Sequence, residues 1–188
     1  TNHGMRLSPW EPPRFLWAAI EGVCGLMLTP GAPRINPLIP VNWKWVGLRD
    51  LPYHGSFLTY FLVREGDAGF RIYSTRDVDS DWSVELYAED VSDNVEVFSD
   101  DVAVIALKRD GGLAILVGNT SEGTVFTSLL IGDAAPPDSR VLLRLYDSAR
   151  GAWESGVELL ATELYNVSLS IEAGGFRVLD VTPAPARP

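Results

Sequence analysis

The 188-residue sequence predicts an all-β protein: an antiparallel β-sandwich of about 10–12 strands preceded by one short apolar α-helix. From Val41 onward, apolar residues recur with a period of two and are interrupted by turn residues at short intervals. Only one segment, near the start, carries apolar residues at helical spacing. The composition, 46% apolar and 21% charged, is that of a globular chain with a sizeable core.

The helix is expected between residues 14 and 27. Two prolines just before it suit a first turn, and Gly25 can end it. Its apolar side chains cover nearly every side: Phe15, Leu16, Trp17, Ala19, Ile20, Val23, Cys24, Leu26 and Met27. Such a helix is predicted to be buried, but a β-sandwich covers one side only. We therefore expect the other side to be covered by an upstream helical domain, or by a homodimer contact through residues 14–27.

The strands follow in order along the rest of the chain. They are expected at residues 43–47, 57–63, 70–73, 82–87, 102–107, 113–117, 124–131, 141–146, 157–164, 167–171 and 176–181. Residues 64–67 and 109–112 read as hairpin loops, the second because Asp-Gly and Gly-Gly accept positive φ. Residues 157–164 also suit a short helix, which stays an alternative.

These elements divide the chain into four parts. Residues 1–13 are expected to be an N-terminal extension or a tag remnant, 14–40 the helix and its connection, 41–182 the sandwich, and 183–188 a flexible tail. The sequence starts at Thr1 without a signal-peptide pattern, which favours a fragment or a processed product and a cytoplasmic location. The apolar segment is shorter than the roughly 20 residues that a membrane helix needs.

Charge and cysteine content exclude several classes of function. The net charge of −10 argues against nucleic-acid binding, since phosphate backbones repel an acidic chain. All of this charge lies in residues 77–101, which contain ten acidic residues and no Lys or Arg. A solvated sheet edge is the favoured reading of that segment. One cysteine and two histidines argue against a disulfide framework or a zinc site, and we expect no cofactor.

Two acidic features are candidate sites. Asp77, Asp79 and Asp81 alternate as in a calcium loop, but Trp82 stands where an EF-hand needs glycine, so only a looser calcium site is expected. Glu21 is the one catalytic candidate, because a carboxylate in an apolar helix must be hydrogen-bonded, raised in pKa, or face a cleft. A helix-end or interface carboxylate is the favoured reading of Glu21.

Aromatic residues form the main binding candidate. Trp43 and Trp45 would share one face of a strand, with Tyr53 and His54 nearby. These four residues are predicted either to stack on a sugar or to lie at a core or domain interface.

Four segments together resemble one family. They are residues 15–26 (FLWAAIEGVCGL), 35–40 (INPLIP), 43–48 (WKWVGL) and 51–55 (LPYHG). They resemble the junction between the last helix and the C-terminal β-sandwich in large bacterial glycosidases with an (α/α)6 barrel, of the glycogen-debranching, trehalase and glucosidase type. Residues 116–121 and 174–181 are similar to the closing strands of such sandwiches.

The resemblance implies a non-catalytic C-terminal accessory domain that packs on an upstream (α/α)6 catalytic domain of the same polypeptide. In that family the catalytic acids lie mostly in the barrel, and the Trp-Thr-Asn-Gly segment of trehalase-like members is missing here. A stand-alone carbohydrate-binding module that takes an oligosaccharide is the alternative, and a self-assembly domain is a third reading. We expect no membrane partner.

Overall fold

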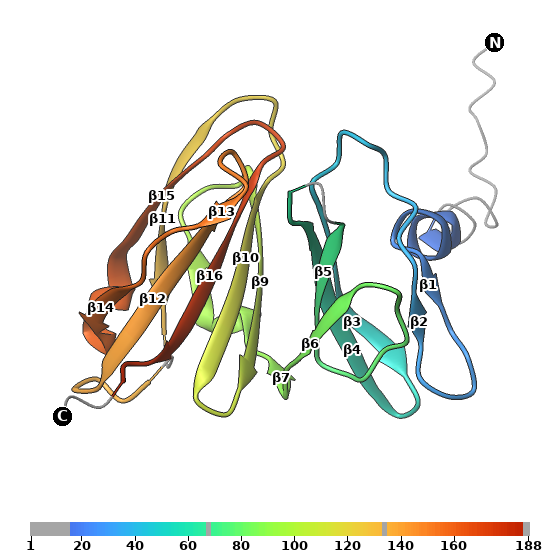
Figure 1. Ribbon diagram of the computed structural model, residues 1–188, viewed down its shortest axis with the longest axis horizontal. Helices are drawn as coiled ribbons and strands as arrows, with labels where there is room; N and C mark the ends of the chain where they lie inside the picture. Colours follow the sequence, from blue (N-terminus) through green and yellow to red (C-terminus); the bar gives the residue numbers. More distant parts are fainter. Residues whose placement is uncertain (1–15, 67–68, 133–134, 186–188) are drawn as a thin grey trace, which may run out of the picture.

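The computed structural model describes residues 16–66, 69–132 and 135–185. It confirms an all-β chain built mostly from antiparallel sheets. The sheets stack face to face as layers, with a three-stranded sheet at one end and a short helix at the other (Figure 1). The molecule thus has more layers than the two of a simple sandwich.

The middle layer is the largest sheet. Its members are β7 (Glu89–Asp90), β9 (Val102–Arg109), β10 (Gly112–Asn119), β12 (Arg140–Asp147), β13 (Ala152–Trp153), β14 (Val157–Leu160) and β16 (Phe176–Pro183). The path runs β13-β12-β16-β10-β9-β7, and β14 pairs with the free part of β12. All of these pairs are antiparallel.

The outer layer on one side is a three-stranded sheet in the order β15-β11-β8. Its strands are β8 (Val95–Val97), β11 (Val125–Ile131) and β15 (Val167–Ile171). A first core fills the space between this outer sheet and the middle sheet, and Leu113, Ile115 and Val117 of β10 point into it.

On its other face the middle sheet meets a four-stranded sheet in the order β3-β4-β5-β6. Its strands are β3 (Trp45–Tyr53), β4 (Ser56–Arg64), β5 (Phe70–Ser74) and β6 (Ser83–Leu86). A second core lies here, and Ala114 and Leu116 of β10 enter it together with Phe61 of β4. Because successive strand residues point to opposite faces, the continuous apolar run in β10 supplies both cores.

The pairing of β5 with β6 is parallel, unlike every other pairing of named strands among the described residues. A third core covers the far face of the four-stranded sheet. It is closed by the ribbon of β1 (Leu26–Met27) and β2 (Arg34–Ile35) and by the helix η1 (Ala18–Val23).

The helix differs from the prediction in two respects. It is a π-helix over Ala18–Val23, with two α-helical residues before it, and none of its residues is buried. Ile20 packs on the third core, whereas Leu16 and Trp17 are each 60% exposed. The helix is thus mostly of the π type and ends at Val23 rather than at residue 27, whereas the expectation that this chain covers only one side of it agrees with the described residues. Phe15 and the two prolines before it lie outside the described residues.

One predicted hairpin loop is confirmed, and one predicted strand is shorter than expected. The hairpin at 109–112 is confirmed, since Arg109 pairs with Gly112, although only Gly111 of these four residues takes positive φ. The single strand predicted at 157–164 is wrong in its second half. It ends at Leu160 and continues as the 3-10 helix η3 (Ala161–Asn166), where the Glu163 carboxylate accepts the Leu160 N–H at 2.6 Å. Residue 67 of the other predicted loop lies outside the described residues.

The acidic segment 77–101 crosses from the four-stranded sheet to the other layers through β6, β7, the 3-10 turn η2 (Ser92–Asn94) and β8. It is not simply a solvated edge, because several of its carboxylates meet arginines from other elements. The pairs are Arg34 with Asp79 and Asp81, Arg71 and Arg109 with Glu85, and Arg49 with Asp90 and Asp93. None of the described helices has the length and apolarity needed to cross a membrane.

Candidate functional site

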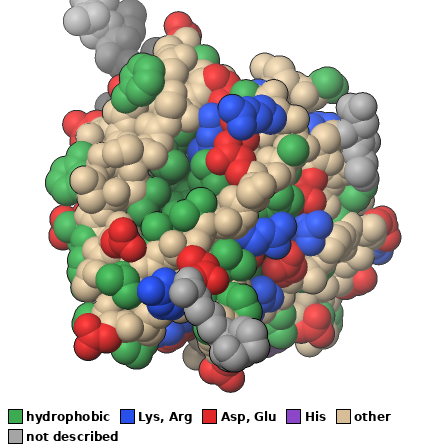
Figure 2. Space-filling view, turned by 60° about the vertical axis from the view of Figure 1, so that its left-hand side comes forward, with side chains coloured by type: hydrophobic (Ala, Val, Ile, Leu, Met, Phe, Trp, Pro, Cys, Tyr) green, Lys and Arg blue, Asp and Glu red, His purple; other side chains and the backbone are tan. Residues whose placement is uncertain are grey.

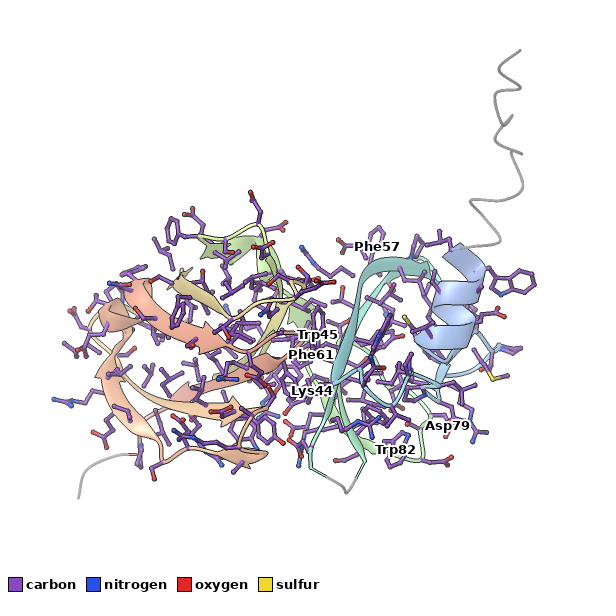
Figure 3. All side chains as sticks on the ribbon, turned by 90° about the horizontal axis from the view of Figure 1, so that it is seen from above. Lys44, Trp45, Phe57, Phe61, Asp79 and Trp82 are labelled. Atoms are coloured by element: carbon purple, nitrogen blue, oxygen red, sulfur yellow. The ribbon has the colours of Figure 1, made fainter. Side chains whose placement is uncertain are left out.

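The predicted aromatic platform does not form one surface. Trp45 begins β3 and its half-buried indole joins the second core, beside Phe61 between two sheets (Figure 3). A Cβ added to Gly118 of β10 would come within 2.4 Å of that indole, so the glycine makes room for it. Trp43 precedes the strand and is 46% exposed. Trp45 therefore lies between two sheets, whereas Trp43 is half exposed.

Tyr53 and His54 both contribute to the local structure, Tyr53 through a loop hydrogen bond and His54 through a turn. The Tyr53 hydroxyl donates to the Thr29 carbonyl at 2.9 Å and to the Gly31 carbonyl, which holds the loop between β1 and β2. His54 and Gly55 form the two-residue turn between β3 and β4, with φ of 47° and 77°. Two positive φ values in a two-residue loop are typical of a type I′ turn.

The three alternating aspartates are not gathered into a cage. Asp79 and Asp81 lie 3.9 and 3.6 Å from Arg34 nitrogens. The Asp79 backbone also accepts the Ile35 N–H at 2.9 Å, which fixes this loop beside β2. In the described parts of the chain, no three His, Cys, Asp or Glu side chains are grouped so that they could hold a metal ion. We therefore interpret the proposed calcium loop as a connecting segment that salt bridges to Arg34 hold beside β2.

Glu21 lies on the exposed side of η1. With Trp17, Ala18 and Gly22 it lines a shallow depression of about 510 Å³. A surface carboxylate keeps its hydration, and its charge costs little there. The position suits an interface carboxylate better than a catalytic acid.

The local sequence explains why this side of the helix faces outward. The Cys24 N–H donates to the Ala19 carbonyl at 2.9 Å and closes the last π turn. Gly25 follows with φ of 64°, and a Cβ there would come within 2.0 Å of the Asn36 carbonyl oxygen. This close approach locks the end of the helix against the segment after β2 and fixes which side rests on the third core.

Four large apolar side chains stand on the outside of this layer. Leu16 and Trp17 on the helix, and Met27 and Leu28 on the ribbon that follows, are each more than half exposed. We call these four residues the outer helix surface. An exposed apolar patch commonly marks a site of protein contact.

A charged cavity of about 370 Å³ lies between the middle and four-stranded sheets. Arg71, Arg109 and Arg144 alternate there with Glu85 and Asp180. Burial raises the pKa of Asp180, and the two nearby arginines, Arg109 and Arg144, oppose that shift. Positive and negative groups alternate around the cavity. The salt bridge between Arg109 and Glu85 connects the middle sheet with the four-stranded sheet.

One exposed aromatic surface was not predicted from the sequence. Phe98, which follows β8, and Phe126 of β11 are 65% and 78% exposed on the outer face of the three-stranded sheet. Their period-two positions gave a usable signal, because an aromatic residue stands there on the side opposite the core.

Comparisons with known proteins give no family. No family model and no curated protein matches the chain. Among solved structures, a GH30 endoxylanase from Clostridium papyrosolvens C71 shows 20% identity and a TM-score of 0.33, over 46% of this chain and 21% of that one. The chain thus spans about a fifth of that enzyme, and a similarity at this level supports no assignment of activity.

Proposed function

We propose that the chain is a non-catalytic accessory domain of a glycoside hydrolase, which packs on and stabilises an (α/α)6 catalytic barrel. The glycosidase part of this proposal rests on the sequence resemblance of residues 15–26, 35–40, 43–48 and 51–55 to the helix-to-sandwich junction of such enzymes. The proposed packing against a barrel is supported by the outer helix surface.

The exposure of Leu16 and Trp17 is the main observation that supports a contact with an upstream domain. Each is 60% exposed on a short helix whose other side is already packed on the third core. Covering a Leu or Trp side chain contributes about 25 cal/mol per Å² of apolar area removed from water. A neighbouring helix laid along this side would cover Leu16 and Trp17 together, while Glu21 at the rim keeps access to water.

The test is to express this chain together with the polypeptide encoded upstream in the same reading frame. We expect an (α/α)6 domain there that co-purifies with the chain, and we expect Leu16→Asp and Trp17→Asp each to reduce the co-purified amount at least tenfold. Phe57→Asp is the matched control, because Phe57 is equally exposed on β4 but lies off the helix (Figure 3).

Three results would contradict the proposal. The first is an upstream reading frame without a helical catalytic domain, and the second is a complex that both helix variants leave intact. The third is a dimer of the chain alone that Trp17→Asp dissociates, which would assign the outer helix surface to self-assembly.

A further inference from the structure

The outer face of the three-stranded sheet carries a second, separate surface. It lies at the opposite end of the stacked layers from the helix (Figure 1). A shallow trough of about 660 Å³ crosses it, formed by Phe98, Phe126, Thr127, Ser128, Ser168, Leu169 and Ser170. Figure 2 brings this end of the molecule forward and shows hydrophobic side chains at the surface, with acidic and basic side chains around them.

The strand register fixes how the exposed side chains lie. Ser168 of β15 stands opposite Ser128 of β11, and their hydroxyl oxygens are 3.4 Å apart. Ser170 stands opposite Phe126, one pair further along the same face. Phe98 is held beside Ser128 by its N–H, which lies 3.4 Å from the Ser128 carbonyl oxygen. Two phenyl rings and three hydroxyls therefore share one surface.

We propose that this trough, named here the serine–phenylalanine face, binds a neutral oligosaccharide. A pyranose ring presents C–H groups on its faces and hydroxyls around its rim. The electron-rich face of a phenyl ring attracts such C–H groups, and a serine hydroxyl both donates and accepts, as a sugar hydroxyl does. None of the seven lining residues is charged, which matches a neutral ligand.

The trough is a surface feature of the outer sheet, lined by seven residues. Its open, shallow shape also suits a chain of sugar units that extends beyond the two phenyl rings. The inference does not rest on the proposed accessory function, because the two surfaces share no residue.

The test is calorimetric titration of the 188-residue chain with maltohexaose, cellohexaose and xylohexaose. We expect saturable binding of at least one of them, weakened about tenfold or more by Phe126→Ala and by Phe98→Ala. Phe57→Ala is the control, because it removes an equally exposed phenyl ring from another layer and should leave the affinity unchanged. Ultracentrifugation and thermal unfolding of each variant establish its oligomeric state and its fold.

Three results would overturn the inference. They are no heat of binding with any of the three sugars at about ten millimolar, unchanged affinity in folded Phe98→Ala and Phe126→Ala variants, or a dimer that Phe126→Ala dissociates. The last would make the serine–phenylalanine face an interface between copies. None of these results bears on the proposed helix contact, which the Leu16 and Trp17 variants test separately.

Discussion

Lys44 Nζ lies 3.2 Å from Glu172 Oε1, although the two residues are 128 positions apart. Lys44 immediately precedes the four-stranded sheet and Glu172 follows β15 of the outer sheet. Between them, the middle layer contributes Ser148, which donates to the same oxygen at 2.5 Å, and Arg177, which donates to Oε2 at 3.0 Å. Arg177 also lies 3.1 Å from Asp147. One carboxylate thus ties three layers together at their rim.

This network predicts a loss of stability in acid. Burial raises the pKa of Glu172, but hydrogen bonds from Ser148, Arg177 and Lys44 outweigh it and lower the pKa to about 2. Because the unfolded carboxyl has its ordinary pKa near 4.5, the stabilisation is complete above that pH and is lost as the pH falls toward 2. We expect Glu172→Gln to lower the free energy of unfolding by about 2 kcal/mol at neutral pH.

Urea denaturation of both proteins at several pH values between 2 and 7 measures this difference. The gap between wild type and Glu172→Gln should narrow steadily below about pH 4.5. Glu122→Gln, at an exposed loop position, is the control and should show no such gap. A gap that stays constant down to pH 2 would contradict the assignment.

Gly118 is predicted to tolerate no side chain. Its missing Cβ leaves room for the Trp45 indole, and an added methyl would come within 2.4 Å of the ring. Both the strand and the indole are packed in place, so we expect Gly118→Ala to cost about 1–3 kcal/mol of unfolding free energy. Gly123→Ala, where nothing lies within 4 Å, should change stability far less. Equal thermal midpoints for the two variants would show that Trp45 moves freely.

The turn at His54 and Gly55 predicts opposite effects of two substitutions. Asn-Gly is the preferred pair in a type I′ turn, so His54→Asn should raise stability by about 0.5 kcal/mol despite losing the ring contact with Tyr53. Gly55→Ala places a Cβ at φ of 77° and should lower it by about 1 kcal/mol. Chemical denaturation of both variants decides the matter, and effects of the same sign would argue against this turn.

Tyr53→Phe is expected to loosen the loop between β1 and β2. The hydroxyl donates to the Thr29 and Gly31 carbonyls, and its removal should cost about 1 kcal/mol. Hydrogen exchange should become faster in residues 28–33 and stay unchanged in β10. Faster exchange throughout the chain would instead point to a global effect.

The strands were predictable because their apolar residues alternate or run without interruption. Phe57–Val63, apolar except for Thr59, and Leu113–Val117, apolar throughout, are central in the structure. The number of layers was not predictable, since a continuous apolar run shows that a strand is covered on both faces but not what covers it. Strands of two or three residues, such as β1, β7 and β13, leave too short a pattern to recognise.

The candidate site was predicted less well than the fold. Alternate residues of a strand lie on the same face, which predicts one face for Trp43 and Trp45. However, β3 begins at Trp45, and this alternation does not apply to residues before the strand. The apolar pattern of residues 14–27 predicts a helix that this chain covers on one side only, as the exposed Trp17 shows, but hydropathy alone does not say what covers the other side. Phe98 and Phe126 could not be singled out from the sequence, because single exposed aromatic residues are common in any chain.

The central strand β10 also limits how this protein can diverge in evolution. Its residues from Leu113 to Val117 alternate between two cores, so no position among them faces water. A charged replacement must enter one core or the other, and an enlarged side chain must be accommodated by an opposing sheet. Descendants of this sequence should therefore exchange only apolar residues in β10, each matched by a change in the layer that it faces.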